Sequence, residues 1–234
     1  MNQSKFIEEL SKINISLNSN QIEQLNKYYE LLIEWNEKIN LTNITEKEQV
    51  YLKHFYDSLT LIKSVDLKEN LTLCDIGTGA GFPGIVLKIV FPNLKITLVD
   101  SLNKRVKFLQ EVIKELNLTN IEVYHERAEI FARQHIESFD VVTARAVAHL
   151  SILLEYCIPM VKINKYFIAM KANINEELEE SQNAIEKLKA KVVKIDSFKL
   201  PVEESNRTII KIEKLEKTNK KYPRNTNEIK RNRL

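Results

Sequence analysis

The sequence predicts an α/β fold, with a mostly parallel, twisted sheet, helices on both of its faces and an N-terminal helical cap. From residue 71 onward, short apolar runs alternate with segments of helical periodicity. Such alternation builds right-handed βαβ units, which form parallel sheets. The chain has 234 residues, of which 44% are hydrophobic and 29% are charged. These values are typical of a globule with a sizeable core, and they exclude a disordered chain or a collagen-like fibre.

The N-terminal part is predicted to be helical and to cap the sheet. Residues 21–40 carry apolar side chains at helical spacing, and Asn18 followed by Gln21 is a variant of the capping box. A second helical stretch covers residues 46–64. No linker-like composition separates these helices from the first strand, so we expect residues 1–66 to be a cap on a single compact domain.

The remaining elements follow in order within residues 67–216, the predicted core of the protein. A turn with a proline and two acidic residues separates the last two strands, which favours a hairpin there. The predicted strands cover residues 71–76, 96–99, 121–124, 139–143, 166–170, 192–198 and 208–212. The predicted helices cover residues 84–91, 104–116, 147–161 and 174–189.

Charge is distributed unevenly along the chain. The net charge is +3, but residues 217–234 hold seven basic residues and one acidic residue. This segment therefore carries +6 and the rest of the chain −3. Basic tails of this kind are typical of segments that contact phosphate groups. We expect residues 217–234 to be a basic tail that contacts nucleic acid and leaves cofactor binding untouched.

The sequence also indicates where the protein works. Acids near the N-terminus stand where a signal peptide has its apolar core, and no apolar run approaches the ~20 residues of a membrane span. The two cysteines, Cys74 and Cys157, lie 83 positions apart in apolar runs, as in proteins of a reducing compartment. We expect a cytoplasmic monomer with no membrane contact and no obligate protein partner.

All four glycines of the chain lie in one short window after the first predicted strand. The spacing of Gly79, Gly81 and Gly84 matches the dinucleotide-binding fingerprint, which is a weak signal alone. The spacing of Asp75, Gly77, Gly79 and Gly81 matches the loop of enzymes that use S-adenosyl-L-methionine (SAM). A turn without a ligand would not need four glycines.

Three observations favour SAM over a dinucleotide. Pro83 removes an N–H from the turn that would hold a pyrophosphate. Asp75 would repel a pyrophosphate, but it can pair, directly or through water, with the cationic methionine end of SAM. The first predicted strand begins at residue 71, which is late for a chain whose first task is dinucleotide binding. Both cofactor classes share Asp100 at the end of the next predicted strand, where a carboxylate can accept both ribose hydroxyls. We therefore predict SAM as the cofactor, with Asp75 and Asp100 at its opposite ends.

The chain resembles the RsmG family, the bacterial small-subunit ribosomal RNA methyltransferases G, also called glucose-inhibited division protein B. The resemblance is carried by Asp-Ile-Gly-Thr-Gly-Ala-Gly-Phe-Pro-Gly (75–84), Leu-Val-Asp-Ser-Leu-Asn-Lys-Arg-Val-Lys-Phe-Leu (98–109), Arg-Ala-Glu (127–129) and Ala-Arg-Ala-Val-Ala (144–148). It is extended by Asn-Leu-Thr (40–42), His54, Asp57-Ser58 and Tyr-Pro-Arg (222–224). The resemblance implies a Rossmann-like SAM-dependent methyltransferase fold with seven strands. It also implies methylation of N7 of the guanine at position 527 of 16S ribosomal RNA, so the expected partner is that RNA or the small ribosomal subunit.

The expected cofactor residues follow the ends of the predicted strands. Ala128 and Glu129 follow the third strand, where the adenine edge lies in this fold and an oxygen can accept from its N6 amino group. A plain helix-capping role for Glu129 is the alternative. Arg145 ends the fourth strand with its guanidinium expected to be free, and a structural ion pair is the alternative. The full expected set is Asp75, Gly77, Gly79, Phe82, Asp100, Ala128, Glu129 and Arg145.

The expected chemistry needs no general base. The Asp/Asn-Pro-Pro-aromatic clamp common in methylation of exocyclic amines is absent from the sequence. Cys74 and Cys157 are interpreted as core residues, not as nucleophiles for a pyrimidine carbon. Guanine N7 carries a lone pair and no proton, so Arg145 is the one expected catalytic residue, orienting cofactor carboxylate, guanine O6 or phosphate. The four histidines show no metal-ligand spacing, so no metal is expected.

Other functions stay open at this point. A SAM-dependent methyltransferase of a small molecule or protein fits the glycine window, but the +6 tail argues against it. A non-catalytic RNA-binding module is disfavoured by the intact set of acids and glycines. A nicotinamide-dependent dehydrogenase is disfavoured by Pro83 and by the lack of length for a substrate domain.

Overall fold

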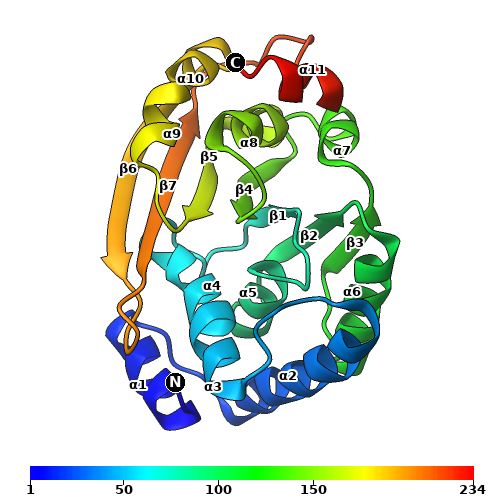
Figure 1. Ribbon diagram of the computed structural model, residues 1–234, viewed down its shortest axis with the longest axis vertical. Coiled ribbons are helices and arrows are strands. Elements are labelled where there is room, and N and C mark those ends of the chain that lie inside the picture. Colours follow the sequence, from blue (N-terminus) through cyan, green and yellow to red (C-terminus); the bar gives the residue numbers. More distant parts are fainter.

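A single seven-stranded sheet organises the molecule, and the computed structural model describes residues 1–174 and 176–234 of the chain. The strands are β1 (Thr72–Ile76), β2 (Lys95–Asp100), β3 (Ile121–His125), β4 (Phe139–Arg145), β5 (Val161–Lys171), β6 (Ala190–Lys199) and β7 (Asn206–Lys214). Their order in the sheet is β3-β2-β1-β4-β5-β7-β6. The first five run parallel, and β7 is antiparallel to β5 and β6. The predicted mostly parallel α/β sheet with a closing hairpin is confirmed (Figure 1).

Helices cover both faces of the sheet (Figure 1). One face packs against α1 (Gln3–Lys12), α2 (Ser19–Ile39), α3 (Lys47–Val50), α4 (Asp57–Leu59), α5 (Gly84–Val90) and α6 (Asn103–Glu115). The opposite face packs against α7 (Ala128–Gln134), α8 (Leu150–Cys157), α9 (Asn175–Glu180), α10 (Gln182–Lys187) and α11 (Thr226–Arg231). A 3₁₀ turn, η3 (Ile158–Met160), links α8 to β5.

The strands alternate between two hydrophobic cores, because successive side chains of a strand point to opposite faces. In β4, Val141 belongs to the core under the N-terminal helices, whereas Val142 belongs to the core under α8. Leu73 and Cys74 divide in the same way in β1. The same alternation turns Arg145, at the end of β4, toward the N-terminal helices.

Several helical regions differ from the prediction, among them α11, which was not predicted. Helix α1 was not predicted; it buries Phe6 and Leu10, and the Asn2 side chain caps its first turn. The predicted helix over residues 46–64 is divided into α3, a π-helical segment η1 (Tyr51–Tyr56), α4 and a 3₁₀ segment η2 (Thr60–Lys63). The Ser58 and Thr60 hydroxyls donate to backbone carbonyls of the preceding turn, a contact that bends helices.

The predicted helix over residues 174–189 is likewise divided into α9 and α10. Ser181 lies between them, and its hydroxyl donates to the carbonyl of Glu177, 2.5 Å away. A hydroxyl that donates to a carbonyl of the preceding turn is therefore found at this break as well. No helix within the described part of the chain has the length and apolar composition that a membrane span requires.

Candidate active site

Two cavities open at the carboxyl ends of the parallel strands, the edge where ligands bind in such sheets. We call the larger one, of about 740 Å³, the cap-side cavity; its wall includes Thr42, His54, Asp57, Arg145 and Arg207. We call the smaller one, of about 270 Å³, the tail-side cavity; its wall includes Asp100, Ala128, Glu129, Thr226 and Lys230. Gly77 lies in both walls, so the cavities meet at the glycine loop.

The glycine loop after β1 approaches the N-terminal helices too closely for a side chain at position 81. Gly81 has φ +94°, and a Cβ there would lie 2.6 Å from the Tyr28 hydroxyl and 2.5 Å from Ile85. The Tyr28 hydroxyl donates to the carbonyl of Ala80. Helix α2 therefore holds the loop directly, and glycine is the residue that fits.

Asp75 lies beneath this loop and is fully buried. Its Oδ2 accepts from the Thr78 hydroxyl at 2.7 Å and from the Gly84 N–H at 2.9 Å. Its Oδ1 is buried and accepts no bond from the described residues. Burial raises the pKa of Asp75 from 3.8 to about 6. An unpartnered buried oxygen fits a cationic ligand, but Asp75 lines neither cavity, so its contact with the methionine end of SAM stays a prediction.

Asp100 ends β2 and lines the tail-side cavity. Its Oδ2 accepts from the Gly79 N–H at 2.9 Å, and its Oδ1 accepts from the Leu102 N–H at 2.9 Å. Arg105 lies 3.4 Å from Oδ2. The carboxylate thus binds the glycine loop to the end of β2 and holds its oxygens at the cavity wall, as ribose binding would require. That role stays a prediction.

Ala128 and Glu129 begin α7 in the wall of the same cavity. Glu129 is buried, and its Oε1 accepts from the Thr226 hydroxyl and lies 3.1 Å from the Arg127 guanidinium. The expected alternative, a helix-capping role, is not seen, because no side chain caps α7 through a hydrogen bond. Cofactor binding by these two residues stays a prediction.

The guanidinium of Arg145 is not free, which corrects the expectation. It donates to the Asp57 carboxylate at 3.1 Å and to the Lys53 carbonyl at 3.0 Å. The other oxygen of Asp57 accepts from Arg207 at 3.0 Å. Asp57 is buried, so one carboxylate holds two arginines in the wall of the cap-side cavity.

His54 contacts both Phe82 and Arg145. Its ring stacks on Phe82 at a centroid distance of 4.3 Å, and its Nδ1 lies 3.4 Å from Arg145 Nη2. Because a guanidinium can only donate, Nδ1 accepts, and Nε2 donates to the Thr42 hydroxyl at 2.9 Å. Burial and the Arg145 charge lower the pKa of His54 to about 3. The ring is therefore neutral at physiological pH, and its one acceptor nitrogen faces a cation.

The other carboxylate of the cap-side cavity is also engaged. Glu177 accepts from the Lys171 ammonium and from the Leu150 N–H. Among the described residues that line this cavity, neither carboxylate nor the histidine is therefore an unpaired proton acceptor. Cys74 and Cys157 are free and fully buried, which confirms them as core residues, and burial raises the pKa of both thiols. The described residues contain no cluster of three or more metal-ligating side chains.

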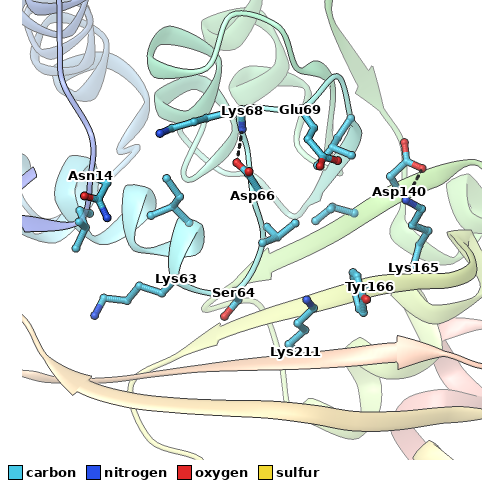
Figure 2. A pocket seen from close by; sticks show the side chains of 15 residues that line it. Asn14, Lys63, Ser64, Asp66, Lys68, Glu69, Asp140, Lys165, Tyr166 and Lys211 are labelled. Carbon is cyan, nitrogen blue, oxygen red and sulfur yellow. Dashed lines mark hydrogen bonds and ion pairs between the residues drawn. The ribbon is translucent and has the colours of Figure 1, made fainter.

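A third cavity, of about 650 Å³, lies at the opposite ends of the strands (Figure 2). Its wall includes Leu71, before β1, and Asp140, at the start of β4. Lys165 points toward Asp140 in Figure 2, at 4.0 Å, and Lys211 lies 3.7 Å from the Tyr166 ring. This cavity lies away from the glycine loop and from every predicted cofactor residue, so it is not the candidate active site.

The C-terminal segment does not lie apart from the body of the protein. Tyr222 and Ile229 are buried in the core under α8, and Arg224 forms an ion pair with the buried Glu155 at 2.7 Å. Helix α11 contributes Thr226 and Lys230 to the tail-side cavity. The expectation of a tail apart from the cofactor region therefore needs correction: only part of it is a solvated basic end.

Comparisons with known proteins decide the family. A family model described as rRNA small subunit methyltransferase G (GidB) matches residues 21–209. The chain is 54% identical over 227 residues to the ribosomal RNA small subunit methyltransferase G of Bacillus licheniformis and 52% identical over 227 residues to that of Bacillus subtilis; each match covers 96% of this chain and 95% of the relative. The chain belongs to this family. The resemblance seen in the sequence is thereby confirmed, and the protein is a SAM-dependent methyltransferase.

Solved structures confirm the fold class. A SAM-dependent methyltransferase from Aquifex aeolicus superposes with a TM-score of 0.54 at 21% identity, covering 73% of this chain and 94% of that chain. A precorrin-6y C5,15-methyltransferase from Geobacter metallireducens superposes with a TM-score of 0.51 at 16% identity, covering 73% and 90%. At these identities the likeness concerns the sheet and its helices alone.

Several residues at the site were not assigned a role from the sequence. Asp57, His54 and Thr42 belong to segments that carry the family resemblance; the structure brings Asp57 and His54 to Arg145, and Thr42 to His54. Arg207 and Thr226 lie in β7 and α11 and gave no local signal. Their partners are 150 and 97 positions away in the chain, so no spacing pattern could connect them.

Proposed function

We propose that the protein transfers a methyl group from SAM to N7 of a guanine in 16S ribosomal RNA, at position 527 by family resemblance. The observation that carries the proposal is the absence of an unpaired proton acceptor among the described residues lining the cap-side cavity. Asp57 and Glu177 are each bonded to cations, and His54 is neutral with its acceptor nitrogen facing Arg145. Methylation of an N–H or O–H group would require such an acceptor, whereas guanine N7 has no proton to lose.

The residues present fit the cofactor. The glycine loop joins the two cavities at Gly77, which gives an extended ligand a continuous path along the sheet edge. In this arrangement Asp100 holds the ribose, Glu129 and the Ala128 backbone face the adenine, and Asp75 lies beneath the methionine end. Bound SAM supplies an electrophilic methyl group, and the chain's task is to hold an acceptor atom in line with it.

Arg145 is proposed to orient the acceptor. Its Nη1 donates to both the Asp57 carboxylate and the Lys53 carbonyl, and its Nη2 faces His54 Nδ1; these contacts keep the guanidinium from swinging over the guanine ring. This restraint is useful because N7 must stay unobstructed, and because the product ring carries a positive charge. The guanidinium edge is then available to guanine O6, to a phosphate or to the carboxylate of the cofactor.

The proposal extends to the partner and the compartment. The substrate is 16S RNA, free or within the small subunit, and the protein acts as a monomer in the cytoplasm without an obligate protein partner. A cap-side cavity of about 740 Å³ is large enough for one extruded base.

The proposal is tested by methyl transfer from tritiated SAM to ribosomal fractions from cells that lack the protein. We expect label in 16S RNA, and none when the same fractions come from cells that contain the protein. Label in total protein or in small molecules would favour the alternative substrates, and absence of any transfer with intact SAM binding would favour a non-catalytic RNA-binding module.

A further inference from the structure

The C-terminal segment is fastened to the body of the protein at several independent points. The Arg224 guanidinium makes two hydrogen bonds to Glu155, at 2.8 and 2.7 Å, and the Arg224 N–H makes a third at 2.8 Å. Arg133 donates to the Pro223 carbonyl at 2.9 Å. Ile229 is fully buried. A segment that only followed RNA phosphates would not need a buried, fully bonded ion pair.

This fastening places residues of α11 in the wall of the tail-side cavity. Thr226 and Lys230 are four positions apart, so they lie on the same face of the helix. The same cavity is also lined by Asp100 and Glu129. Residues close to the C-terminus therefore complete a cavity whose other walls come from the glycine loop and the strand ends.

Thr226 makes a specific contact in this wall. Its hydroxyl, in a buried residue, donates to Oε1 of Glu129. Arg127 lies 3.1 Å from the same oxygen. Oε2 of Glu129 accepts no hydrogen bond from the described residues. One oxygen of the carboxylate is thus fixed by the chain, and the other is left for a donor in the cavity.

We propose that Thr226 is a positioning residue of the cofactor site: it holds Glu129 so that Oε2 accepts a hydrogen bond from the exocyclic amino group of adenine. This inference rests on the proposed function, because it takes the tail-side cavity to hold the adenosine moiety. The C-terminal helix then contributes to selection of the cofactor, in addition to any contact of the segment with RNA.

The test compares two ligands that differ at the adenine amino group. S-adenosylhomocysteine carries the amino group, whereas S-inosylhomocysteine carries an oxygen there, which would face the Glu129 carboxylate unfavourably. Their dissociation constants are measured by calorimetry for the wild-type chain, for Thr226→Val and for Thr226→Ser. Lys220→Gln, an exposed position in the same segment, is the matched control.

We expect the wild-type chain to prefer S-adenosylhomocysteine by about tenfold or more, the effect of one hydrogen bond to a charged group. Thr226→Val should lose most of this preference, while Thr226→Ser, which keeps the hydroxyl, and Lys220→Gln should retain it. Thr226→Ala serves in place of the valine variant if the latter unfolds, which thermal melting reports.

Two results overturn the inference, and a third overturns the proposed function instead. If Thr226→Val keeps the wild-type preference, or raises the dissociation constants of both ligands equally, Thr226 has only a structural role. If the wild-type chain binds S-adenosylhomocysteine without any preference over the inosine analogue, Glu129 does not read the amino group. If the wild-type chain binds neither ligand, the proposed function itself fails.

Discussion

The two cavities at the sheet edge are built in different ways. The tail-side cavity is formed by the ends of β1 and β2, the segments that follow β3 and β4, and side chains of α8, with α11 added from the end of the chain. The cap-side cavity is formed by the N-terminal helices, the end of β4 and β7. The first contains Asp100 at the end of β2 and two acids, Glu126 and Glu129, after β3. The second contains a network of alternating charges. The tail-side cavity therefore depends mainly on local backbone geometry, and the cap-side cavity depends on contacts between residues distant in sequence.

The comparison predicts where substitutions act. Changes in the tail-side cavity should alter cofactor affinity, and changes in the cap-side cavity should alter the rate of methyl transfer with bound cofactor. The following predictions run from the largest expected effect to the smallest.

Asp100→Ala should weaken SAM binding by about a hundredfold. The substitution removes two charge-assisted bonds to the ribose, each worth roughly 1.5 kcal/mol or more, and it frees the Gly79 N–H from its acceptor. Calorimetric titration with SAM measures the effect. Asp100→Asn, which keeps the shape of the side chain, should lose less SAM affinity. An unchanged affinity of the alanine variant would mean that the carboxylate only holds the glycine loop.

Arg145→Ala should lower the methylation rate at saturating SAM by more than tenfold, about 1.4 kcal/mol or more of transition-state stabilisation. Asp57→Asn keeps the guanidinium but removes its charged partner, so a smaller loss is expected. Single-turnover assays measure the rates, and thermal melting measures stability. If both variants lose the same stability and neither loses rate in the folded protein, the ion pair is structural.

SAM affinity should rise with pH up to about 6 and then level off. Burial raises the pKa of Asp75 to about 6 in the free protein. A nearby cationic ligand would lower this pKa. At pH values between the lowered pKa and 6, binding of SAM therefore releases a proton from Asp75. The affinity at pH 5 should therefore be about tenfold weaker than at pH 7. Asp75→Asn should remove this dependence, and a flat profile in the wild type would place Asp75 away from the ligand's positive charge.

Charge removal from the exposed part of the tail should have the smallest effect per residue. Replacing Lys217, Lys220 and Lys221 by Gln should lower the salt dependence of RNA binding by about one unit of slope for each RNA phosphate that the chain no longer neutralises. Affinity for SAM should be unchanged, because these side chains lie outside both cavity walls. Lys114→Gln, on α6, is the matched control, and an unchanged slope would mean that the three lysines are only solvated.

The sequence predicts the places of the residues around the glycine loop far better than the contacts of Arg145, for a physical reason. Asp75 and Asp100 lie in the last residues of β1 and β2, the glycine loop follows β1, and parallel strands bring their ends to one edge. Local patterns were sufficient here because each residue's place is set by its own strand.

The contacts in the cap-side cavity could not be predicted from local patterns. Arg145 was placed correctly at the end of β4, but its partner Asp57 is 88 positions earlier, in a helical stretch that serine and threonine hydroxyls divide into short pieces. Helix α11 had no predicted role in the cofactor region either, since Ile229 and Thr226 become buried only by packing on the body. Such contacts depend on the completed fold.

The most direct test of the account is the identity of the methylated atom. Purified protein and SAM are incubated with small subunits from cells lacking the protein, and the extracted 16S RNA is reduced and treated with aniline, which cleaves the chain at a guanine whose ring carries the N7 methyl charge. The account predicts cleavage at one guanine, absent without SAM and strongly reduced with Arg145→Ala. A methyl group found instead on an exocyclic amine, a ribose oxygen or a pyrimidine carbon would contradict it, since each of those acceptors needs a base or a thiolate that the described residues lining the cap-side cavity do not provide.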